Sequence, residues 1–143
     1  GTTLAGALIY GGTAYCVNVG DSRIYKANQN RITQISKDHS YVQFLVDSGK
    51  MTPKEARNSK YRNIITRAVG TDAKVNPDVM RTPAEEGERL LICSDGLSSM
   101  LEDKEIYRLI SGRAPTKKKV ESLIAAANDK GGYDNITCTL IEF

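Results

Sequence analysis

The chain has 143 residues, the usual length of one domain, and its content of 40% hydrophobic and 26% charged residues is ordinary for a globular protein. Its net charge of +3 is too small to indicate nucleic-acid binding. No apolar run reaches the roughly 18 residues that a membrane span needs, and no signal peptide opens the sequence, so we expect no membrane partner.

The first part of the chain alternates short apolar runs with turn residues, which predicts closely spaced antiparallel strands. Gly11–Gly12 predicts a hairpin turn, and Gly20-Asp21 interrupts the next apolar run. The expected strands span residues 4–10, 13–19, 23–26 and 31–36.

Two short helices are predicted next. Ser40 is placed to cap the first, which Gly49 should end. The sequence Thr52-Pro53-Lys54-Glu55 is a capping box with proline at the first helical position, and should begin a helix that runs to residue 57 or 58.

The remaining sequence predicts a strand over 75–81, a buried strand over 90–93 and a final strand over 135–143. Asp103 and Thr116 are candidate caps of helices that run to Ile110 and to about Asp129. The basic run Lys117–Lys119 is interpreted as a solvated helix end. Strands and helices do not alternate strictly, so the predicted class is α+β with an antiparallel sheet core, in one domain.

Three cysteines, Cys16, Cys93 and Cys138, lie far apart in apolar runs, and no Cys-x-x-Cys pair occurs. This spacing argues against zinc. An odd number of cysteines without a secretory segment indicates buried reduced thiols and a cytoplasmic chain.

Three aspartates occupy predicted strand ends beside turn residues: Asp21, Asp95 and Asp134. Carboxylates gathered at one sheet edge would repel one another unless a cation lay between them. Mg²⁺ and Mn²⁺ prefer such oxygen ligands, and a pair of these ions can activate water for phosphoryl transfer. An Asp-Gly pair such as Asp95-Gly96 is also a common turn sequence, so spacing alone leaves the turn and the metal site both open.

Six motifs in a fixed order decide between these readings. They are "GTT" (1–3), "NVGDSRIY" (18–25), "SKDHS" (36–40), "NIITRAVG" (63–70), "LLICSDGLSSML" (90–101) and "GGYDNIT" (131–137). In this order the chain closely resembles the metal-dependent Ser/Thr protein phosphatases of the PPM/2C type in their compact bacterial form, over essentially its whole length.

The resemblance implies a central antiparallel β-sandwich flanked by helices, two or three Mg²⁺ or Mn²⁺ ions, and hydrolysis of phosphoserine and phosphothreonine. The partners would be proteins phosphorylated by a Ser/Thr kinase. By the same resemblance Asp95 and Asp134 are ligands of the second metal. Asp95 also contributes to a third metal, and Asp21 is associated with that weaker third site. Residues 47–62 correspond to a flap that touches the substrate, and their capping signals suggest a small folded lid.

The family's N-terminal motifs have no counterpart in this sequence. They comprise a phosphate-binding arginine, an Asp-Gly-x-Gly-Gly motif whose aspartate bridges two metals, and a histidine that acts as general acid. His39 is the only histidine here, and we interpret it as a structural residue of the "DHS" motif. No catalytic residue is therefore assigned, and residues 1–143 are expected to form a partial phosphatase domain that is inactive by itself.

Three interpretations follow: part of a phosphatase, a truncated relative that binds phosphoproteins or acts as a scaffold, or a regulatory domain that has lost its metals. The missing segment would also cover strands 4–10 and 13–19. Without that segment the apolar side chains of these strands should lie exposed. The chain should then self-associate through them, bind another polypeptide there, or be covered by an upstream segment. These side chains include Leu4, Leu8, Ile9, Tyr15, Val17 and Val19.

Overall fold

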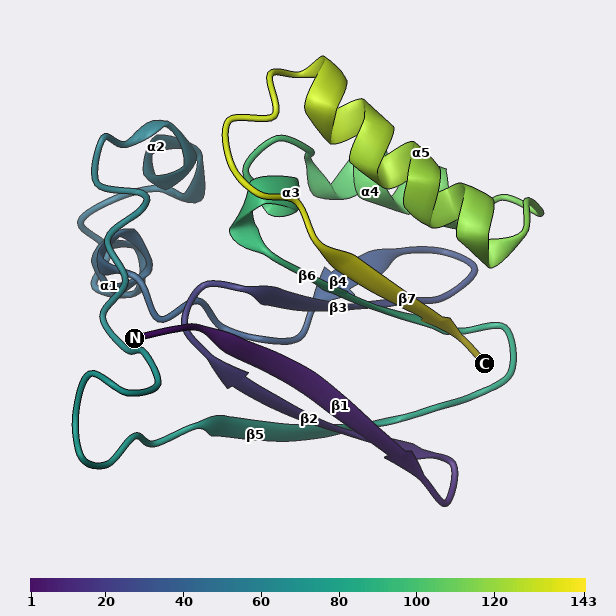
Figure 1. Ribbon diagram of the computed structural model, residues 1–143, viewed down its shortest axis with the longest axis horizontal. Coiled ribbons are helices and arrows are strands. Elements are labelled where there is room, and N and C mark those ends of the chain that lie inside the picture. Colours follow the sequence, from purple (N-terminus) through teal and green to yellow (C-terminus); the bar gives the residue numbers. More distant parts are fainter.

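Two antiparallel sheets stack face to face in the computed structural model, which describes residues 1–143 (Figure 1). One sheet has the order β1-β2-β5, formed by Leu4–Tyr10, Thr13–Val19 and Asp78–Pro83. The other has the order β4-β3-β6-β7, formed by Ile32–Gln34, Arg23–Ala27, Arg89–Cys93 and Cys138–Glu142. The predicted α+β class with an antiparallel sandwich is confirmed.

The helices lie in two groups (Figure 1). The outer face of the four-stranded sheet is covered by α3 (Asp95–Ser98), α4 (Asp103–Ile110) and α5 (Thr116–Asp129). At one side of the sandwich, α1 (Tyr41–Asp47) and α2 (Pro53–Asn58) stand beside the sheets. None of these helices combines the length and apolar composition that crossing a bilayer requires.

Two apolar cores follow from this layering. The larger core lies between the four-stranded sheet and the helices, and its centre includes Tyr25, Leu91 and Leu123. The smaller core lies between the sheets and contains Ala14, Cys16, Ile24 and Leu90. Alternate residues of β2 enter this second core because successive side chains of a strand point to opposite faces.

Local capping follows the sequence closely in the first helical pair. The Gln43 amide donates to Ser40 Oγ at 3.2 Å at the start of α1. The predicted capping box at Thr52 and Glu55 is also present. Two other predicted caps were wrong, because α4 is capped by Glu102 and α5 begins after Pro115.

Several strands differ in length from their predicted spans because a strand continues only while a neighbour pairs with it. Strand β4 keeps only the residues that pair with β3. Strand β5 begins at Asp78, opposite Asn18, and β7 begins at Cys138, opposite Cys93. Isolated bonds continue beyond β4, such as that from the Ile35 amide to the Ile24 carbonyl at 2.8 Å, but the regular ladder ends there.

Lys119 corrects the interpretation of the basic run as wholly solvated. Its side chain is 4% exposed, and its Nζ lies 2.5 Å from Glu142 Oε1 on β7. Arg89 on β6 binds the same carboxylate at 2.8 Å. A lysine can be buried here because the opposite charge of Glu142 meets it beneath α5.

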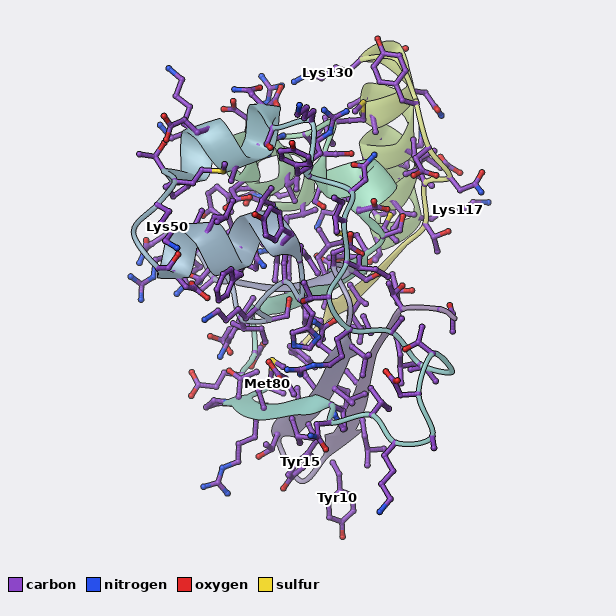
Figure 2. All side chains as sticks on the ribbon, turned by 90° about the vertical axis from the view of Figure 1, so that its left-hand side faces the viewer. Tyr10, Tyr15, Lys50, Met80, Lys117 and Lys130 are labelled. Atoms are coloured by element: carbon purple, nitrogen blue, oxygen red, sulfur yellow. The ribbon has the colours of Figure 1, made fainter.

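The outer face of the three-stranded sheet carries no helix (Figure 1). Its most exposed apolar side chains are Leu8 at 66%, Tyr10 at 75% and Val79 at 72%. Figure 2 shows Tyr10 and Tyr15 at the end of the molecule away from the helices. Val19 was expected on this bare face but is buried, at the end of β2 where the nearby Thr2 pairs with Val69.

Candidate metal centre

Asp95 and Asp134 come from segments that adjoin the same end of the β6–β7 strand pair. Asp95 follows β6 and is the first residue of α3, while Asp134 lies in the loop between α5 and β7. Asp95 and Gly96 open a short helix, α3, that the sequence analysis did not predict.

Gly96 lets the two aspartate segments touch. A Cβ atom built on Gly96 would lie only 2.2 Å from the carbonyl oxygen of Asn135 and 3.5 Å from the carbonyl carbon of Asp134. A side chain at this position would collide with backbone atoms that cannot rotate away. The first turn of α3 therefore packs directly on the backbone of Asp134 and Asn135.

Ser94 ties the same two segments together by hydrogen bonds. Its amide donates to the Thr137 carbonyl at 3.0 Å, and its hydroxyl donates to the Asn135 carbonyl at 3.1 Å. The Thr137 amide in turn donates to Ser94 Oγ at 3.1 Å. These bonds hold the segment before β7 against the end of β6, so Asp95 and Asp134 are neighbours.

Asp21 reaches the same region from the other sheet. It follows Gly20, whose φ of +106° lies in the region that glycine alone adopts readily. A Cβ on Gly20 would also lie 2.4 Å from Thr3 Cγ2. Glycine is therefore required for the sharp turn that directs the chain from β2 to Asp21.

The charge of Asp134 acts on Asp95, and the charge of Asp95 acts on Asp21. Burial, followed by the negative charge of Asp95, raises the pKa of Asp21 to about 6. Burial and the charge of Asp134 likewise raise the pKa of Asp95. Asp95 thus occupies the middle of an electrostatically unfavourable series, which a cation would relieve.

The carboxylates do not converge into one compact cage. No group of three His, Cys, Asp or Glu side chains is arranged so that it could hold a metal ion. The oxygen donors fit a hard cation that takes one or two carboxylates and keeps several waters, as Mg²⁺ does. Asp95 with Asp134, and Asp95 with Asp21, are the pairs that could provide those carboxylates.

A cavity of about 490 Å³ opens beside Asp21 and Asp95. Its opposite wall is formed by the helical pair α1–α2 and the residues that follow, and it carries the cations Lys54, Arg57 and Arg62. Arg57 Nη2 donates to the Ser99 carbonyl at 3.3 Å and so joins α2 to the end of α3. The cavity thus faces acidic residues on one side and basic residues on the other.

Arg23 and Asp38 line this cavity, and the sequence analysis assigned them no role. Arg23 Nη2 binds Asp38 Oδ2 at 2.7 Å, and Gln34 Nε2 donates to Asp38 Oδ1 at 2.8 Å. The positive charge of Arg23 partly offsets the repulsion at Asp21 and Asp95. Arg23 belongs to the motif "NVGDSRIY" and Asp38 to the motif "SKDHS", so the motifs that indicate Asp21 and His39 also contain these two residues.

His39 has a structural environment. Its side chain is buried, and its Nδ1 accepts a hydrogen bond from the Gly20 amide at 3.0 Å. Its Nε2 lies 3.0 Å from Asp78 Oδ2 and 2.9 Å from Arg67 Nη1. Both ring nitrogens are engaged, so His39 supports the turn before Asp21 and has no free nitrogen for acid–base chemistry.

The fold of the chain agrees with the comparison with known proteins. The family model described as "Protein phosphatase 2C" matches residues 1–141. The chain belongs to the protein phosphatase 2C family. The resemblance inferred from the six motifs is thereby confirmed.

Named relatives place the chain among bacterial members of this family. It is 37% identical over 142 residues to the "Serine/threonine phosphatase stp" of Listeria welshimeri, covering 99% of this chain and 56% of the relative. The crystal structure of the Staphylococcus aureus serine/threonine phosphatase Stp1 superposes with a TM-score of 0.95 at 38% identity, covering 99% of this chain and 56% of that one. The chain thus spans about half the length of the relatives that it matches.

One similar structure was solved with metal. It is the catalytic domain of the serine/threonine phosphatase PstP in complex with two manganese ions, with a TM-score of 0.84 and 36% identity. The alignment covers 96% of this chain and 56% of that domain. The 2C family thus includes a member with two manganese ions on a fold that this chain shares.

Proposed function

We propose that this chain forms part of a phosphoprotein phosphatase that hydrolyses phosphoserine and phosphothreonine. The substrates would be proteins phosphorylated by a Ser/Thr kinase. Similar proteins are named serine/threonine phosphatases, which supports the reaction class. The observation in this molecule that carries the proposal is the packing of Gly96 on Asn135, which sets Asp95 beside Asp134.

Asp95, Asp134 and Asp21 are the proposed metal ligands, and the ion is Mg²⁺ or Mn²⁺. The raised pKa values of Asp21 and Asp95, and the oxygen donors of all three side chains, fit a hard divalent cation. When bound, such a cation would supply an activated water and would stabilise charge on the phosphoryl group. The residues themselves would hold the ion and present it to the cavity that Arg57 and Lys54 line.

Manganese binding tests the site directly. Isothermal titration of the chain should show weak Mn²⁺ binding that Asp95→Asn reduces at least about tenfold, because Asp95 is the carboxylate shared by both candidate pairs. Asp129→Asn, an exposed acid at the end of α5, is the matched control and should bind as the wild type does. Equal Mn²⁺ affinity of the wild type and Asp95→Asn would show that Asp95 is not a ligand of the ion.

Activity of residues 1–143 alone should be low. Asp95, Asp134 and Asp21 provide too few ligands to bridge two ions, and His39 has no free ring nitrogen. A general acid is typically worth about 10²–10⁴-fold in rate. Hydrolysis of p-nitrophenyl phosphate with Mn²⁺ should therefore stay close to the buffer rate, and turnover typical of an enzyme would show that the chain completes its site in another way.

Residues 1–143 are proposed to be a single partial phosphatase domain, with residues 47–62 as a lid over the cavity. The bond from Arg57 to the Ser99 carbonyl supports this assignment, because it connects the lid to the helix that begins at Asp95. We also propose a cytoplasmic location, because the three free cysteines fit a reducing compartment.

A non-catalytic role in binding phosphoproteins is the second candidate. The engagement of both His39 ring nitrogens favours it, because the chain then offers no histidine for proton transfer. The two functions are distinguished by incubating a phosphopeptide with the chain and Mn²⁺. Binding without phosphate release would favour the second candidate.

The bare face of the three-stranded sheet should make the isolated chain self-associate. Leu8, Tyr10 and Val79 are largely exposed on that face, and β1 is an edge strand that pairs only with β2. Sedimentation velocity at low micromolar concentration should show dimers or larger species, and Leu8→Lys should shift the distribution toward monomer. A strictly monomeric 15.7 kDa wild-type species with cooperative unfolding would contradict this expectation.

A further inference from the structure

Two of the three cysteines face each other across neighbouring strands. Cys93 ends β6, Cys138 begins β7, and the two residues are register partners in the antiparallel ladder. Their strand ends carry the candidate metal ligands: Asp95 follows Cys93 by two positions, and Asp134 precedes Cys138 by four. The third cysteine, Cys16, lies in the other sheet.

The neighbouring backbone hydrogen bonds show whether Cys93 and Cys138 form a hydrogen-bonded or a non-hydrogen-bonded pair of the ladder. The Ser94 amide donates to the Thr137 carbonyl, and the Phe143 amide donates to the Glu88 carbonyl. In an antiparallel ladder hydrogen-bonded pairs alternate with non-hydrogen-bonded pairs, which places Cys93 and Cys138 in a non-hydrogen-bonded pair. Such partners have Cα atoms about 4.5 Å apart, within the range of about 4.4–6.8 Å that disulfides span.

Both thiols also point to the same side of the sheet. Cys93 belongs to the core beneath the helices, and Cys138 packs against that core. Cys16 instead belongs to the core between the two sheets. Cys93 and Cys138 therefore meet on one face, while the sheet separates Cys16 from them.

We propose that Cys93 and Cys138 form a reversible disulfide that crosslinks β6 to β7 next to Asp95 and Asp134. The inference rests on strand register and does not depend on the proposed phosphatase function. The oxidant would be a peroxide and the reductant a small thiol, both of which react with protein sulfur.

The reaction balances in two steps. The sulfur of Cys138, the half-buried thiol, attacks a peroxide oxygen and the O–O bond breaks. The departing hydroxide takes the Cys138 proton and leaves as water, and Cys138 becomes a sulfenic acid. The sulfur of Cys93 then attacks the sulfur of Cys138, the S–O bond breaks, and the departing hydroxyl takes the Cys93 proton as a second water. The two thiols lose two protons and two electrons in total, and hydrogen peroxide takes them up to become two waters.

The buried environment makes this oxidation slow. Burial raises the pKa of Cys138, and it raises that of Cys93 to about 12, so both groups are thiols at neutral pH. The bridge is therefore expected only after sustained oxidation, and its formation is best measured at equilibrium.

The test compares the folded and unfolded chain in the same glutathione redox buffer. After equilibration, acid quenching and alkylation, mass spectrometry of peptides measures the fraction in which Cys93 and Cys138 are joined. We expect the equilibrium constant for this bridge to be at least about tenfold larger in buffer than in concentrated guanidinium chloride, because the fold holds the thiols opposite each other. An equal or smaller constant in the folded chain would overturn the proposal.

Matched variants identify the sulfurs involved. Cys16→Ala should keep the bridge, and Cys138→Ala and Cys93→Ala should each lose it. Should Cys93→Ala fail to fold, Cys138→Ala and the peptide map of the wild type still decide the question. A bridge that contains Cys16, a bridge between two chains, or only mixed disulfides with glutathione would each show that the register pair does not form the disulfide.

Discussion

Gly96→Ala is expected to destabilise the chain by about 3 kcal/mol, the upper end of the usual range for overpacking. The new methyl group would lie 2.2 Å from the Asn135 carbonyl oxygen, so either α3 or the Asp134 segment must move. The same movement would separate Asp95 from Asp134 and should weaken Mn²⁺ binding at least about tenfold. Urea unfolding and isothermal titration measure the two effects.

Gly112→Ala is the matched control for this substitution. A Cβ atom on Gly112 meets no heavy atom within 4 Å, so stability and Mn²⁺ affinity should stay close to those of the wild type. If Gly96→Ala unfolded at the wild-type urea concentration and bound Mn²⁺ equally well, the close packing of the two segments would have no bearing on the site.

Glu142→Gln should destabilise the chain by about 2 kcal/mol at pH 7. It leaves the Lys119 ammonium group buried without its counter-charge, and breaking a buried pair usually costs about 3–5 kcal/mol. The expected value is lower because the Glu142 side chain is 26% exposed to screening water. Glu121→Gln, an exposed acid on α5, is the control and should change stability by less than about 0.5 kcal/mol.

The effect of Glu142 should depend on pH with a definite sign. Burial alone raises the pKa of this carboxyl, but hydrogen bonds from Lys119, Thr116 and Arg89 outweigh it and lower the pKa to about 2. The ordinary value is 4.5, so the stabilisation is complete above pH 4.5 and is lost as the pH falls toward 2. Urea unfolding of wild type and Glu142→Gln should thus converge with falling pH, and a constant difference from pH 7 to pH 3 would refute the assignment.

The order and type of most elements could be predicted from the sequence because their signals are local. The alternating residues of β2 and the capping box at Thr52 depend on neighbours a few positions away. The ends of β1 and β2 were predicted correctly, but those of β5 and β7 could not be predicted, because they depend on partners far along the chain, as Asp78 of β5 depends on Asn18. The burial of Lys119 was missed for the same reason, since Glu142 lies on a different element.

The residues of the candidate site could be proposed from the sequence, but their geometry could not. The motifs singled out Asp21, Asp95 and Asp134, but the sequence gives no sign that Gly96 contacts Asn135. Gly96 was interpreted only as part of a turn, because the contact joins segments that are remote in sequence. Arg23 and Asp38 were missed because their role follows from their ion pair beside Asp21.

The pairing of β2 with both β1 and β5 has a consequence for how the chain folds. The β1–β2 hairpin closes over Gly11–Gly12, so it can form within about 1–10 μs. Strand β5 can join the hairpin only when a long intervening segment closes into a loop, since Tyr15 pairs with Arg81. Topologies dominated by such non-local pairing fold in milliseconds to seconds, so stopped-flow refolding should show a slow main phase in which β5 docks last.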